Sequence, residues 1–303
     1  MKHRIILTGS NGLLGQKIIN ILAGRANVQL LATSRGVNRH AERGGYLYKD
    51  LDLLDYGLWA AEFESFKPTA VIHTAAMTQV DACEDQRESC DKINAEAVHH
   101  LAQLCKEYDT HLVHISTDFV FDGAAGPYDE NAKPNPVNYY GQAKLKAEEY
   151  VQENAGSWAI LRTMLLYGIT PSMSRSNIVL WVKRSLEAEK EIKVVDDQFR
   201  CPTLAEDLAN ASVSAAMRKA QGIFHISGAE MMSIYEIAER AAEFWKLDTG
   251  LMSHTDSASL NQAAKRPPKT GFVILKAQTE LDYQPHSFAQ GLAIVDQQIR
   301  EMN

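Results

Sequence analysis

The sequence predicts an α/β fold, a doubly wound parallel sheet with a smaller, discontinuous C-terminal lobe. Short apolar runs alternate with amphipathic segments over about the first 165 of the 303 residues. Alternating strands and helices of this kind build parallel sheets with right-handed crossovers. Beyond Gly168 the alternation loosens. We therefore predict a first domain at 1–165 and a lobe mainly at 166–303, with segments near 192–227 returning to the first domain.

The first apolar run, Arg4 to Thr8, leads directly into a glycine-rich turn and then an amphipathic helix. Glycines permit a tight turn and a close approach of the backbone to a pyrophosphate, which binds at the helix N-terminus. The spacing is Gly-x-x-Gly-x-x-Gly, whereas most dehydrogenases have Gly-x-Gly-x-x-Gly. A turn that binds nothing is the alternative. We expect a Rossmann-like dinucleotide-binding domain with contacts from Gly9, Asn11, Gly12, Leu13, Leu14 and Gly15.

The second strand, Val28 to Thr33, ends in Ser34-Arg35. An NAD-selective site offers a carboxylate to the ribose here, whereas an arginine suits a 2′-phosphate. We therefore favour NADP(H), with NAD(H) as the second choice, although Arg35 could equally be a solvated loop residue. A third strand lies around Tyr46 to Tyr48 and precedes Asp52 and Leu53. These two are expected near the adenine, while an N-cap is the alternative for Asp52.

Two further strands end in small or hydroxylated residues. The fourth strand, Ala70 to Thr74, is followed by Ala75, Ala76 and Thr78, which leave room for a cofactor. The fifth strand, Leu112 to Ile115, runs into Ser116-Thr117-Asp118. In open α/β sheets, ligands bind at the carboxyl ends of the strands. A helix is expected from Glu84 to Tyr108.

Tyr140 and Lys144 are separated by one turn of an expected helix. Side chains at i and i+4 are neighbours, and a nearby ammonium lowers the pKa of a phenol. A half-buried ring beside a solvated amine would give the same pattern. Together with a nearby hydroxyl, however, the pair supplies a proton donor and acceptor for carbonyl/alcohol interconversion. We therefore expect Tyr140 and Lys144 to be catalytic.

Composition excludes several classes of protein. A net charge of -7 argues against a general nucleic-acid binder. The four cysteines and ten histidines show no metal-ligand spacing, so we predict reduced thiols and no metal. No stretch approaches the roughly twenty apolar residues of a membrane span, and the N-terminal apolar run is too short for a signal peptide. We expect a cytoplasmic protein.

Taken together, these motifs resemble the extended short-chain dehydrogenases/reductases, and among them the dTDP-4-dehydrorhamnose reductases. The most specific match is Ser116-Thr117-Asp118-Phe119-Val120-Phe121-Asp122-Gly123. The resemblance covers nearly the whole chain and includes Ala75-Ala76-Met77-Thr78-Gln79-Val80-Asp81, Leu161-Arg162-Thr163, Val195-Asp196-Asp197-Gln198 and Arg266-Pro267.

The resemblance implies an NADPH-dependent oxidoreductase of dTDP-rhamnose biosynthesis that reduces the C4 ketone of a nucleotide-linked 6-deoxy sugar. Tyr140 would protonate the developing alkoxide, Thr117 would hydrogen-bond the same oxygen, and Lys144 would hold the nicotinamide ribose. Two departures lie on the substrate side. Leu165 stands where the reductases commonly have tryptophan, and Phe119 replaces a frequent tyrosine. The expected substrate contacts are Asp118, Phe119, Leu165, Asn177, Arg200 and Arg266.

Two other functions fit the same motifs. The regulatory β-subunit of methionine adenosyltransferase resembles these reductases, binds NADP and acts through contact with another enzyme. Ser227-Gly228 followed by Tyr235-Glu236 is shared with that subunit. Epimerisation or dehydration of another nucleotide sugar is the second alternative, although dehydratases typically carry an acidic pair after the catalytic threonine, where this chain has Asp118-Phe119. A homodimer is compatible with the sequence.

Overall fold

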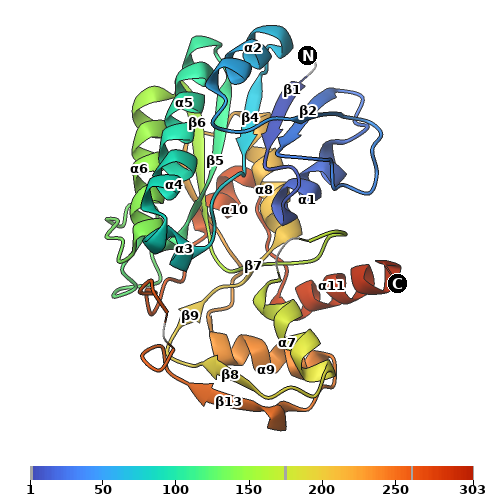
Figure 1. Cartoon of the computed structure of the whole chain (residues 1–303), viewed down its shortest axis with the longest axis vertical. Helices are drawn as coiled ribbons and strands as arrows, with labels where there is room; N and C mark the ends of the chain where they lie inside the picture. The colour runs from blue at the N-terminus through green and yellow to red at the C-terminus, as the bar shows by residue number, and fades with distance from the viewer. Residues whose placement is uncertain (1–2, 174–175, 261, 303) are drawn as a thin grey trace.

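The computed structural model describes residues 3–173, 176–260 and 262–302. Its centre is a seven-stranded parallel sheet in the order β11-β6-β5-β4-β1-β2-β3, which confirms the predicted fold class (Figure 1). The strands are β1 (His3–Thr8), β2 (Val28–Ser34), β3 (Leu47–Asp50), β4 (Ala70–His73), β5 (His111–Thr117), β6 (Ser157–Thr163) and β11 (Gly222–Ile226).

Helices cover both faces of the sheet, because side chains of each buried strand alternate between two apolar cores. In β1, Ile5 and Leu7 belong to one core and Ile6 to the other. The first core is shared with α1 (Leu13–Leu22), α8 (Ala205–Arg218) and α10 (Leu275–Leu281). The second is shared with α2 (Tyr56–Phe66), α5 (Ala97–Glu107) and α6 (Tyr139–Asn154), seen on the opposite side of the sheet in Figure 1.

The predicted continuous helix from Glu84 to Tyr108 is wrong. The chain instead forms α3 (Val80–Asp85), α4 (Arg87–Asp91), a π-helical turn (Lys92–Glu96) and then α5. Within the π-helical turn, the Asn94 amide bonds both the N–H and the C=O of Met77, at 2.8 and 2.9 Å. π-Helical turns concentrate at functional sites, and this one ties α5 to the loop that follows β4.

The C-terminal part forms the smaller lobe at the bottom of Figure 1. It contains α7 (Ile178–Glu187), β8 (Ile192–Val195), α9 (Ile234–Phe244) and β13 (Met252–Thr255). Short pairs β7 (Leu166–Tyr167) with β10 (Thr203–Leu204) and β9 (Phe199–Arg200) with β12 (Met232–Ser233) connect it to the sheet. Within the predicted returning range 192–227, β11 joins the central sheet and α8 packs on α1, whereas β8 pairs with β13 in the lobe.

The last helix, α11 (Phe288–Met302), packs with the lobe and reaches back to the first helix of the chain. Lys17 of α1 donates to Gln298 of α11 at 2.9 Å and pairs with Glu206 of α8 at 2.8 Å. These contacts hold the lobe against the sheet. Among the described residues, no helix combines the length and apolarity needed to cross a membrane.

Candidate active site

The glycine turn lies between β1 and α1, where the strand order reverses between β1 and β4. Gly9 has φ +68°, and a Cβ there would lie 2.7 Å from the backbone nitrogen of Ala75. A Cβ on Gly15 would lie 2.3 Å from the carbonyl oxygen of Gly9. Both glycines therefore permit close packing of the turn.

Gly12 has a different environment. It is the N-cap of α1. Among the described residues other than Gly12 and its two chain neighbours, only the Gly9 oxygen, at 3.3 Å, lies within 4 Å of an added Cβ. No side chain in the described part of the chain caps the helix, so the first-turn N–H groups of Leu13, Leu14 and Gly15 have no side-chain cap. An uncapped helix end with open space in front suits an anionic group such as a pyrophosphate.

The Asn11 side chain makes hydrogen bonds to other residues of the protein. Its side-chain nitrogen donates to the Val37 carbonyl at 2.9 Å, and its side-chain oxygen accepts from the Arg39 N–H at 2.9 Å. The side chain is 9% exposed. Asn11 thus shapes the loop that follows β2, a structural role that the sequence did not reveal, and its contact with a cofactor stays a prediction.

Arg35 and Asp52 lie near each other at the ends of β2 and β3. The Arg35 guanidinium is 3.9 Å from the Asp52 carboxylate, and the arginine side chain is 73% exposed. Asp52 also accepts the N–H of Leu54 at 3.0 Å, and Leu53 is half-buried. The guanidinium is thus exposed at the end of β2, and its contact with a ligand phosphate stays a prediction.

The loop after β4 is held on two sides. Thr8 of β1 accepts the N–H groups of Thr74 and Ala75 at 3.2 and 3.3 Å, and Asn94 holds Met77. Ala75 and Ala76 are half-buried and Thr78 is exposed. Small side chains therefore line the loop opposite the glycine turn.

The predicted catalytic residues come from two elements. Thr117 ends β5, and Tyr140 and Lys144 occupy the first turns of α6. Asn138 caps α6 by accepting the Gly141 N–H at 2.8 Å. A Cβ on Gly141 would lie 2.1 Å from the Phe119 carbonyl oxygen. The missing side chain therefore lets α6 approach the loop that carries Thr117.

Thr117 and Tyr140 are brought together in the structure. The Thr117 hydroxyl donates to Asp118 at 3.2 Å and accepts the Phe119 N–H at 3.2 Å. Burial raises the pKa of Tyr140 above its ordinary value, while its hydrogen bond with Thr117 lowers it and the charge of Asp118 raises it. The predicted lowering of the Tyr140 pKa is thus wrong for the free protein, because desolvation of the phenolate outweighs the other effects.

Lys144 is 2% exposed. Its ammonium donates to the Ile115 carbonyl at 2.8 Å and contacts His114 Nε2 at 3.1 Å. Burial lowers the pKa of Lys144 to about 8, while the negative charge of Glu148 raises it. The lysine is therefore held beneath the strand that ends in Thr117.

Asp118 and Arg200 form a buried ion pair, with Arg200 Nε 3.1 Å from Asp118 Oδ2. The hydroxyl of Thr270 donates to the same oxygen. Arg200 also donates to the carbonyls of Phe199 and Pro267, both at 2.7 Å. Asp118 and Arg200 thus join the loop after β5 to the lobe, and their predicted substrate contact stays a prediction.

Arg266 and Asn177 also bind protein atoms. Arg266 makes two 2.6 Å hydrogen bonds to the two carboxylate oxygens of Asp81, and this contact lowers the pKa of Asp81. Asn177 caps α7 through the Leu180 N–H at 3.1 Å and donates to the Gly168 carbonyl at 2.7 Å. Their predicted substrate contacts therefore stay predictions.

Phe119 and Leu165 are half-buried. The Phe119 ring meets the Tyr140 ring edge-on, with centroids 5.9 Å apart. Leu165 has φ +40°, a conformation that costs a branched side chain about 1–2 kcal/mol. Residues in strained backbone conformations cluster at functional sites.

His73, Cys83 and Cys90 are three other buried side chains. His73 Nδ1 bonds the Thr8 hydroxyl at 2.8 Å, while its buried Nε2 has no hydrogen-bond partner among the described residues. The Cys90 thiol donates to the Cys83 sulfur at 2.8 Å beside Tyr140, and both cysteines are free thiols. In the described part of the chain, no three His, Cys, Asp or Glu residues are grouped to hold a metal.

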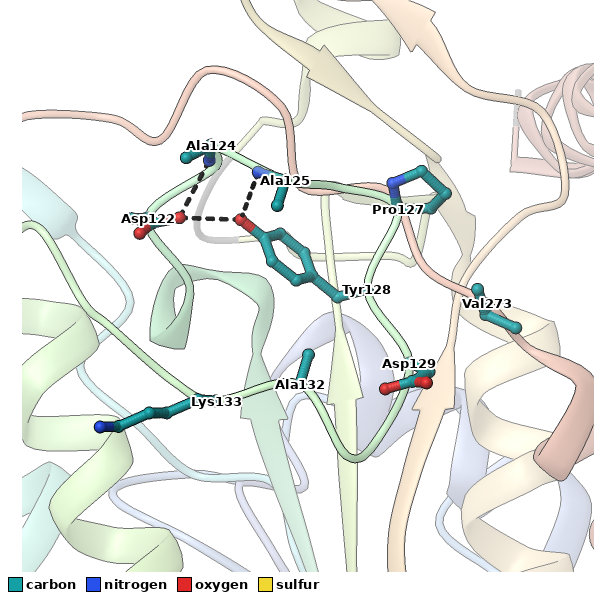
Figure 2. A pocket seen from close by; sticks show the side chains of 9 residues that line it. All are labelled: Asp122, Ala124, Ala125, Pro127, Tyr128, Asp129, Ala132, Lys133 and Val273. Carbon is teal, nitrogen blue, oxygen red and sulfur yellow. Dashed lines mark hydrogen bonds between the residues drawn. The ribbon is translucent and has the colours of Figure 1, made fainter.

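The residues drawn in Figure 2 line a hollow, in which Tyr128 points toward Asp122. The volume of this hollow is about 440 Å³. The Tyr128 hydroxyl donates to Asp122 at 2.8 Å, and Asp122 also accepts the Ala124 N–H at 2.9 Å. None of Thr117, Tyr140 and Lys144 lines this hollow. The contacts shape the loop that leads into α6.

Residues 2–300 match the profile of the RmlD substrate binding domain. The chain belongs to this family. It is similar to the methionine adenosyltransferase 2 subunit beta of Xenopus laevis, with 32% identity over 81% of this chain and 73% of the relative. It is also similar to the dTDP-4-keto-6-deoxy-D-glucose reductase of Streptomyces niveus, with 30% identity over 89% of this chain and 88% of the relative.

Among solved structures, the chain is similar to the dTDP-4-dehydrorhamnose reductase of Bacillus anthracis in complex with NADP. The TM-score is 0.85 at 28% identity, over 98% of this chain and all of that one. The predicted resemblance to the extended reductases is therefore confirmed.

Proposed function

We propose that the protein uses NADP(H) to reduce the C4 ketone of a nucleotide-linked 6-deoxy sugar, and that the sugar is dTDP-4-dehydro-rhamnose, which becomes dTDP-rhamnose. The observation that carries this proposal is the contact of Tyr140 with Thr117 at the carboxyl end of β5, with Lys144 one turn farther along α6. The chain is a member of an oxidoreductase family.

The residues around the glycine turn fit a dinucleotide. Gly12 and the uncapped first turn of α1 would hold the pyrophosphate. Arg35, exposed at the end of β2, would meet a 2′-phosphate. The B. anthracis structure contains NADP, which supports the choice of NADP(H) over NAD(H).

When bound, the cofactor supplies a hydride. The protein's own residues supply the proton. Because burial keeps Tyr140 protonated, its phenol can donate to the alkoxide that develops on the ketone oxygen. The Thr117 hydroxyl would bind the same oxygen and stabilise its charge. The Lys144 ammonium would hold the nicotinamide ribose and lie close to the developing tyrosinate.

The methionine adenosyltransferase β-subunits favour a second function, that of an NADP-binding regulatory subunit. Seven of these subunits share 29–32% identity with the chain. In such a protein, Tyr140 and Lys144 would serve cofactor binding alone. Epimerisation or dehydration of a nucleotide sugar is the other alternative, and the lack of a second acid after Asp118 argues against it.

The deciding experiment is NADPH oxidation by the purified protein with dTDP-4-dehydro-rhamnose, followed by absorbance at the nicotinamide band. We expect turnover that Tyr140→Phe reduces by about 10²–10⁴-fold, the usual contribution of a general acid, while NADPH affinity is preserved.

Either of two results would contradict the reductase assignment. One is near-normal reduction by the Tyr140→Phe variant. The other is tight NADPH binding without turnover of this sugar or of related 4-keto sugars, which would favour the regulatory function and direct the search to a protein partner.

A further inference from the structure

The ammonium of Lys144 is bound to β5 by two contacts. It donates to the Ile115 carbonyl at 2.8 Å and meets His114 Nε2 at 3.1 Å. An ammonium has three N–H groups and accepts no hydrogen bond. Two of the three therefore point at β5, and the direction of the third is fixed by them.

His114 belongs to a pair of histidines beneath this ammonium. His73 and His114 are Cα partners in the β4–β5 ladder, and their rings stack with centroids 5.4 Å apart. Both side chains are at most 1% exposed. His73 is bound in turn to the Thr8 hydroxyl at 2.8 Å. The position of the His114 ring is thus set by packing as well as by the lysine.

The contact with Lys144 requires neutral His114. Since the ammonium can only donate, His114 Nε2 must accept, and the ring proton lies on Nδ1. A protonated ring would point N–H at the ammonium. Burial, followed by the charge of Lys144, holds the pKa of His114 well below its usual range. His114 is therefore a permanent acceptor at neutral pH.

We propose that His114 is a positioning residue that holds the Lys144 ammonium against β5, so that its third N–H is directed at the bound cofactor. This inference rests on the proposed function, because it assigns Lys144 to cofactor binding. His114, a buried side chain of β5, would thus support the site formed by Thr117, Tyr140 and Lys144 without contacting the substrate.

The inference predicts how cofactor binding depends on pH. Burial lowers the pKa of Lys144, and the charges of Glu148 and Cys90 partly oppose this lowering. Tyr140 lies one turn away on α6, and the two neutral histidines lie beneath the ammonium. With a Lys144 pKa of about 8, the ammonium is lost and NADPH binding weakens as the pH rises through this value. A hydrogen bond to the charged form favours it, so removal of the His114 acceptor moves the loss to lower pH.

The test is NADPH affinity between about pH 6 and pH 10, measured by fluorescence titration without any sugar. We expect His114→Leu to move the alkaline loss of affinity about one pH unit lower. His114→Asn, whose amide is too short to reach the ammonium, should do the same and serves if the leucine variant does not fold. His114→Gln, which can place an oxygen near the Nε2 position, should restore the wild-type profile.

Two controls separate positioning from stability. His111, on the same strand, is fully buried and bonds Ser157 through Nδ1 at 2.8 Å. His111→Leu should leave the pH profile in place even if it lowers stability. Lys144→Met should abolish the alkaline loss altogether.

If His114→Leu and His114→Asn both kept the wild-type pH dependence of NADPH affinity, the inference would be overturned and the proposed function would stand. Failure of the wild-type protein to bind NADPH would overturn both.

Discussion

At the scale of one residue, Arg35 is an exposed side chain whose charge is expected to affect cofactor choice more than folding. Its guanidinium lies at the end of β2, 3.9 Å from the Asp52 carboxylate. A charge in this position has little effect on folding, because exposed pairs contribute roughly 0–1 kcal/mol. Its contribution is therefore expected in ligand selection.

We predict that Arg35→Asp reduces the preference for NADPH over NADH by about 10- to 100-fold, since a carboxylate repels the 2′-phosphate and suits the ribose hydroxyls. Affinities for both cofactors, measured by fluorescence titration, check this. Arg25→Asp, also exposed, makes the same charge change elsewhere and should leave the ratio unaltered. An unchanged ratio in Arg35→Asp would show that another residue selects the cofactor.

At the scale of an element, α6 depends on a close approach to the loop that follows β5. A Cβ at Gly141 would lie 2.1 Å from the Phe119 oxygen and 3.0 Å from Pro136 Cβ. The helix would have to move away from Thr117 to accept it. Tyr140 directly precedes Gly141 in the helix and would move with it.

We predict that Gly141→Ala destabilises the protein by about 1–3 kcal/mol and lowers kcat for the proposed reduction. Urea unfolding and steady-state kinetics measure the two effects. Gly57→Ala in α2 is the matched control, since its added Cβ meets only the Asp55 carboxylate at 3.9 Å. Equal stability of the two variants would mean that the backbone of α6 adapts to the methyl group.

On the scale of the whole molecule, the Asp118–Arg200 ion pair connects the sheet to the lobe. Arg200 belongs to β9, whereas Asp118 follows the central strand β5. Burial raises the pKa of Asp118, and Arg200 opposes that rise. Removing the arginine would leave a buried carboxylate without its cation.

We predict that Arg200→Met costs about 3–5 kcal/mol of unfolding free energy, measured by urea denaturation. Adding Asp118→Asn should recover part of this loss, because it removes the stranded charge. Arg218→Met, which breaks an exposed pair with Asp282, should cost less than about 1 kcal/mol. Similar losses in the two single arginine variants would contradict the role given to the buried pair.

Sequence alone determined the chain order of the first five strands of the central sheet, the glycine turn and the Tyr140–Lys144 spacing. These features depend on neighbours in the chain: the apolar content of a short run, the conformational freedom of glycine and the i,i+4 geometry of a helix. The Asn138 cap of α6 is also local and could have been found from its position before the helix.

Only the tertiary structure decided which groups meet and which are desolvated. Thr270 reaches Asp118 across 152 residues of chain, and Lys144 meets His114 because α6 packs on β5. The same packing buries Tyr140 and raises its pKa, whereas spacing alone indicated a lower one. The π-helical turn at Asn94 likewise depends on a loop from another strand. Such contacts depend on burial and on distant partners, which local patterns do not encode.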